Sequence, residues 1–105
     1  MNNKIITAFT KLINSDVIKN IYPMIDHVDI ISLDKSDRRS GYDLSVSIFL
    51  NDPSITKNNM YQKDFDPHYL VEKHIKDLSK YLGIDLNYIG FKLYGPDGDL
   101  ILNWD

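Results

Sequence analysis

The chain contains no cysteine. This absence excludes disulfide crosslinks, thiolate zinc sites and cysteine nucleophiles, and it fits a reducing compartment. No apolar run approaches the roughly 20 residues that a membrane helix needs, and the first residues lack the sustained apolar stretch of a signal peptide. We therefore expect a small soluble domain of the cytoplasm, with no membrane partner.

The chain also lacks an excess of basic charge, and glutamate is scarce. Lysine and arginine number 12 against 15 acidic residues, which gives a formal net charge of −3. Proteins that hold a phosphate backbone usually carry a basic excess, so the composition gives nucleic-acid binding no general support. The acidic residues are almost all aspartate, with Glu72 as the single glutamate, and Ile, Asn, Lys and Tyr are abundant. Such usage is common in AT-rich genomes, and the hypothesis it raises is a phage or mobile-element accessory protein of the host cytoplasm or the virion.

What the sequence does contain fits one domain over residues 1–105, with a hydrophobic fraction of 43%. Apolar residues at helical spacing predict a helix from Asn3 to about Tyr22, which the polar residues 14–16 could interrupt. β-Branched residues predict a strand over 25–33, and strict alternation predicts a second strand over 42–50. The polar run between them predicts an antiparallel hairpin.

The second half begins with a long connection over residues 51–66, whose apolar residues favour packing onto the domain. Asp66 followed by proline is typical of a helix start, and Gly83 of a helix end. Two further strands are expected over 84–94 and 100–104, joined by a glycine-containing turn.

This order of elements, α-β-β-α-β-β, predicts an α+β fold with two helices on one face of a four-stranded antiparallel sheet. The same order is a circular permutation of the ferredoxin-like β-α-β-β-α-β plan, which we take as the guess for the sheet geometry. The two halves could equally be a doubled αββ unit. In either case the helices leave the opposite face of the sheet uncovered.

The chain offers only a weak metal site and no catalytic constellation. Asp64, Asp66 and His68 occupy alternate positions, but zinc sites usually need three or four ligands, and Asp66 is expected to cap the helix instead. No serine lies in a nucleophile elbow and no glycine loop of the phosphate-binding type follows a strand. We therefore expect a non-enzymatic protein without a cofactor.

Aromatic residues on the uncovered sheet face are the candidates for a protein interface. Tyrosine and tryptophan are enriched at binding hot spots. We therefore predict an interaction or assembly module. It presents this face, or an edge strand, to another protein or to a second copy of itself as a homodimer. An alternative for the tryptophan is that it folds under the sheet and closes the core. The candidates are Phe49, Tyr88, Tyr94 and Trp104.

The rival hypothesis is a single-stranded nucleic-acid-binding domain. Sheet surfaces with exposed aromatics bind single strands by base stacking. The first hairpin adds a small basic and aromatic group beside that face, although neighbouring aspartates offset its charge. This group consists of Lys35, Arg38, Arg39 and Tyr42.

Overall fold

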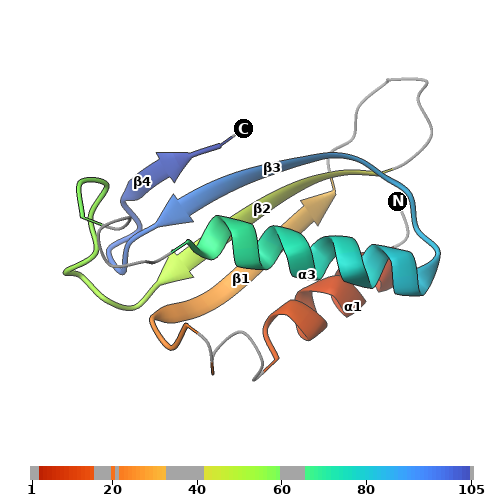
Figure 1. Cartoon of the computed structure of the whole chain (residues 1–105), viewed down its shortest axis with the longest axis horizontal. Coiled ribbons are helices and arrows are strands. Elements are labelled where there is room, and N and C mark those ends of the chain that lie inside the picture. The colour runs from red at the N-terminus through yellow and green to blue at the C-terminus, as the bar shows by residue number, and fades with distance from the viewer. Residues whose placement is uncertain (1–2, 16–19, 21, 33–41, 60–65, 105) are drawn as a thin grey trace.

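The computed structural model describes residues 3–15, 20, 22–32, 42–59 and 66–104. It confirms the α+β prediction: two helices cover one face of a four-stranded sheet (Figure 1). No helix among these residues is long and apolar enough to span a membrane. The elements are α1 (Asn3–Ile13), β1 (Ile25–Ser32), β2 (Tyr42–Leu50), α3 (Pro67–Leu82), β3 (Leu86–Tyr94) and β4 (Leu100–Asn103).

The sheet is mixed, whereas the sequence predicted an antiparallel one. Its strand order is β1-β2-β3-β4, and the outer pairs β1/β2 and β3/β4 are antiparallel as expected. The central pair β2/β3 is parallel, because helix α3 returns the chain to the end of the sheet at which β2 began. The alternating residues of β2 are typical of a strand with one open face, and here they occur in a strand with one antiparallel and one parallel neighbour.

The permuted ferredoxin-like guess is also corrected by the strand order. In the ferredoxin-like plan the two strands joined by a helix are split by another strand between them. Here β2 and β3 flank α3 in the chain and are direct neighbours in the sheet. The topology is therefore two successive αββ units that meet at the central parallel pair.

Local sequence explains the bounds of α3. The Asp66 carboxylate accepts a hydrogen bond from the Tyr69 backbone N–H at 3.1 Å, which satisfies one of the unpaired donors of the first turn. At the other end Gly83 adopts a left-handed conformation with φ 68°, and its N–H donates to the carbonyl of Lys80. A side chain at Gly83 would be strained by that φ, so glycine ends the helix here.

The hydrophobic core lies between the helices and the sheet. Phe9 and Ile13 come from α1, and Val71 and Ile75 from α3; all four are fully or almost fully buried. The face of the sheet beneath them is a row of alternating residues from three strands, which explains why β2 is so regular in sequence. These residues are Val28, Ile30, Leu44, Val46, Ile48, Leu50, Phe91 and Leu93.

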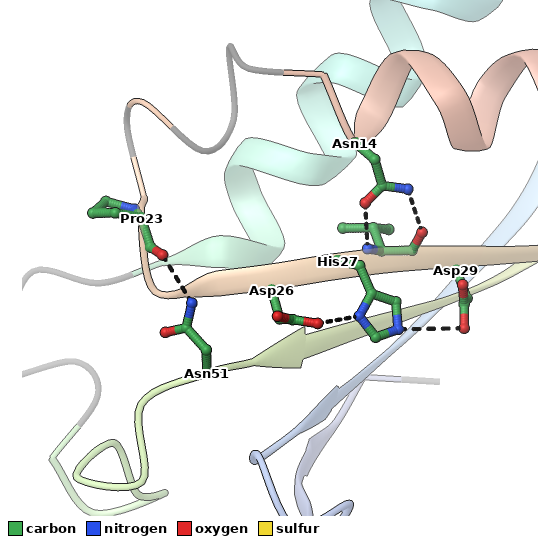
Figure 2. Close-up of polar contacts among 7 residues, drawn as sticks. Asn14, Pro23, Asp26, His27, Asp29 and Asn51 are labelled. Atoms are coloured by element: carbon green, nitrogen blue, oxygen red, sulfur yellow. Dashed lines mark hydrogen bonds and ion pairs between the residues drawn. The ribbon is translucent and has the colours of Figure 1, made fainter.

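Helix α1 ends at Ile13, directly before the polar residues 14–16 that were expected as a possible break, and Tyr22 at the predicted far end is not helical. Residues 16–19 and 21 lie outside the described residues. The Asn14 side chain turns onto strand β1 at the end of the helix (Figure 2). Its Nδ2 donates to the Val28 carbonyl at 2.8 Å, and its Oδ1 accepts from the Val28 N–H at 2.7 Å. One amide thus joins the helix end to the outer edge of the sheet.

The described part of the long connection, residues 51–59, is a folded turn. Ile55 is buried in the core, and Asp52 Oδ1 accepts hydrogen bonds from the backbone N–H and the hydroxyl of Ser54. The Asn59 side-chain amide donates to the Ser54 carbonyl at 2.8 Å. This part packs onto the domain, as its apolar residues predicted; residues 60–65 lie outside the description.

Candidate functional site

The face of the sheet opposite the helices carries an apolar row across all four strands. The register pairs His27 with Phe49, Phe49 with Tyr94, and Tyr94 with Leu100. Paired residues point to the same face, so these four side chains form one continuous row, which we call the ladder. Leu100, at its end, is 53% exposed.

The three rings of the ladder are stacked nearly parallel. The centroids of His27 and Phe49 are 4.5 Å apart with an interplanar angle of 7°, and those of Phe49 and Tyr94 are 5.0 Å apart at 13°. Both faces of the Phe49 ring are therefore occupied by neighbouring rings. The ladder presents ring edges to a partner, as a rigid apolar ridge.

His27 is held between two carboxylates on its own strand. Its Nδ1 lies 2.6 Å from Asp26 Oδ2, and its Nε2 lies 3.8 Å from Asp29 Oδ2 (Figure 2). Asp26 is the extra residue at a register shift in β1, directly before His27 at the end of the sheet. These contacts fix the orientation of the imidazole ring and place negative charge beside the ladder.

A hollow of about 510 Å³ lies at the end of the open face, next to the ladder. Its rim is formed by the start of β1, the end of β2 and the β3–β4 turn. Asn51, after β2, links to the segment before β1, because its Nδ2 donates to the Pro23 carbonyl at 3.1 Å (Figure 2). The described residues that line it include two carboxylates, Asp26 and Asp97, and neither lysine nor arginine. Apolar contact and negative charge therefore coincide here.

The remainder of the open face is mostly polar. The row beside the ladder runs Asp29, Ser47, Lys92 and Asn103. Tyr88 pairs with Asp43 near the start of β2, about 20 Å from the ladder at 3.3 Å per residue. Of the predicted interface candidates, the structure thus brings Phe49 and Tyr94 together and leaves Tyr88 at the opposite end.

Trp104 does not share this face. Its indole stacks on the imidazole of His68 from helix α3, with centroids 4.7 Å apart and an angle of 18°. His68 also contacts the buried ring of Phe91 edge-on, and the backbone N–H of Trp104 donates to the Phe91 carbonyl at 2.8 Å. The tryptophan therefore lies on the helix side and helps to close the core, which is the alternative that the sequence left open.

The two metal candidates within the described residues, Asp66 and His68, have other roles. Asp66 caps helix α3, and His68 packs against Trp104 with its Nε2 3.2 Å from Glu72 Oε2. Asp64 lies outside the described residues. Within the ranges that the structure describes, no group of three or more His, Asp or Glu side chains could hold a metal ion.

The residues of the nucleic-acid alternative cannot be placed. Lys35, Arg38 and Arg39 fall in the segment 33–41, outside the described residues, and so does the side chain of Tyr42. The described part of the face offers this alternative little support. Base stacking needs an open ring face, but both faces of Phe49 are covered, and the adjacent hollow is acidic.

Two members of the ladder, His27 and Leu100, were not predicted. The alternation in β2 placed Phe49 on the open face correctly, but the register shift near Asp26 hides the alternation of β1. A second shift between Leu93 and Tyr94 does the same for β4. The imperfect alternation of residues 25–33 does indicate a bulge or a strand buried on both sides, but it does not fix the position of the shift or the pairing that results.

Comparison with known proteins identifies no relative of the chain. No protein-family model matches the chain, and no curated protein or solved structure matches it either.

Proposed function

We propose that the chain is a non-enzymatic protein-interaction module that binds its partner with the open face of the sheet. The observation that carries the proposal is the ladder, a row of His27, Phe49, Tyr94 and Leu100 that spans every strand on the face without helices. Rigid aromatic side chains supply large contact areas at low entropic cost, and they are enriched where interfaces bind most strongly.

The surroundings of the ladder support this use. The row of rings at one end of the face lies beside polar side chains such as Ser47, Lys92 and Asn103. Protein interfaces similarly combine an apolar part with polar surroundings. The stacked rings also lose little further freedom on binding, because their neighbours already fix them. We place this activity in the cytoplasm; a phage or mobile-element origin, with the host cytoplasm or the virion as its location, rests on residue usage alone.

The experiment is co-purification of the chain from its native source, followed by binding measurements with the partner so identified. We expect Phe49→Ser together with Tyr94→Ser to weaken the complex by at least about tenfold, because two adjacent anchors are truncated. Leu12→Ser is the matched control, since Leu12 is an exposed apolar residue of α1, away from the open face. A complex that binds the double variant as tightly as the unaltered chain would contradict the proposal.

A further inference from the structure

The outer side of helix α3 carries a lysine stripe, defined as Lys73, Lys76 and Lys80. These positions fall on one side of the helix, because they recur at three- and four-residue spacing. All three are exposed, and Tyr69, 64% exposed, continues the same side one turn earlier. A shallow hollow of about 350 Å³ runs along this stripe.

Two acidic residues accompany the stripe without cancelling it. Glu72 Oε1 lies 2.9 Å from Lys76 Nζ, and Glu72 also contacts His68, so its charge is shared with groups already in place. Asp77 lines the same hollow. The three lysines against Glu72 and Asp77 thus leave one net positive charge on this side of the helix.

The stripe and the ladder face opposite directions. Val71 and Ile75 of α3 are buried against the core face of the sheet, so the stripe on the other side of the helix points away from the sheet. The ladder and its acidic hollow lie on the far face of the same sheet. Figure 1 shows both helices on the other face. The hollow beside the ladder is therefore acidic, although Lys92 lies in the neighbouring row of the open face, and the outer side of α3 is basic with an exposed tyrosine.

From this charge complementarity we propose that the partner of the open face is a second copy of this chain, which docks its α3 stripe there. Lys73 and Lys80 of one copy face Asp26 and Asp97 of the next, while Tyr69 contacts the ladder. This inference rests on the proposed function and names its partner. Because the two surfaces differ, the contact is heterologous, and it repeats head to tail into an open chain or a closed ring.

The test uses two charge-reversed forms of the full chain. One carries Asp26→Lys and Asp97→Lys, and the other carries Lys73→Glu and Lys80→Glu. All four side chains are exposed, so the substitutions should leave the fold intact. Sedimentation velocity at a concentration on the order of 100 μM, a range that detects micromolar affinity, measures the size of each form and of their mixture.

We expect the unaltered chain to form assemblies larger than a monomer, and salt to weaken them because the contact is electrostatic. Each reversed form alone should associate at least about tenfold more weakly. Their equimolar mixture should assemble again, since each supplies the surface that complements the other. Lys11→Glu and Asp85→Lys, reversals at exposed positions that line neither hollow, are the matched controls and should leave assembly unchanged.

Three results would overturn the inference: a monomeric unaltered chain, reversed forms that still assemble, or a mixture that stays monomeric. If the chain is monomeric but binds a different protein in a Phe49-dependent manner, a second copy is not the partner, and the proposed function still holds. If binding of that protein does not depend on Phe49 either, both this inference and the proposed function are wrong.

Discussion

The side-chain amide of Asn14 pairs with both backbone hydrogen-bonding groups of Val28, at 2.8 Å and 2.7 Å. It occupies the place that a neighbouring strand would take at this point of β1, which is an edge strand of the sheet. Unpaired edge strands are templates for association, so the amide both fixes α1 to the sheet and covers part of that edge.

Replacement of Asn14 by alanine should therefore destabilise the fold. We expect a loss of about 1–2 kcal/mol in the free energy of unfolding, because two hydrogen bonds to the backbone of the fully buried Val28 are removed. Urea denaturation followed by circular dichroism measures the change. Asn58→Ala, at an exposed loop position, is the control and should stay within about 0.5 kcal/mol of the unaltered chain.

The stacked pair of Phe49 and Tyr94 should show energetic coupling. In a double-mutant cycle with alanine at each position, we expect a coupling free energy of about 0.5–1 kcal/mol, as found for cross-strand aromatic pairs. The cycle is measured by chemical denaturation. A cycle between Phe49 and Tyr88, which are distant on the same face, should give a value near zero; equal coupling in both cycles would contradict the ladder geometry.

Asp66 should behave as a helix cap. Asp66→Ala should cost about 1 kcal/mol of unfolding free energy, because the Tyr69 N–H loses its acceptor. Asp77→Ala, at an exposed position inside α3, should cost less. Addition of a chelator should leave the thermal midpoint of the unaltered chain unchanged; a fall in the midpoint would instead indicate a metal held by Asp66.

Single-stranded nucleic acid should bind weakly or not at all. The Phe49 ring has no open face, and the hollow beside it carries Asp26 and Asp97, which repel phosphates. Fluorescence anisotropy with a labelled oligothymidylate at low salt measures this. Tight binding that disappears on Arg38→Ala and Arg39→Ala would support the nucleic-acid hypothesis in place of protein binding.

The sequence predicted the elements better than their pairing. Helix α3 was readable because Asp66, Pro67 and Gly83 mark its ends by local chemistry, and the alternation of β2 reported its two faces. The direction of β3 relative to β2 depends on how α3 crosses the sheet, which no local pattern encodes. The ladder depends on two register shifts as well, so Phe49 could be assigned to the open face but its stacking partner His27 could not.

The parallel pairing of β2 with β3 has a consequence for how the chain could be divided. Each half, α1-β1-β2 and α3-β3-β4, contains its own antiparallel hairpin. The two hairpins are joined in the sheet by the pairing of β2 with β3, which lie before and after residues 51–59 in the chain. A cut in that exposed turn would leave two fragments of similar architecture, each with half of a shared apolar interior. Such fragments are suited to reassociation on mixing, in which β2 of one fragment pairs with β3 of the other.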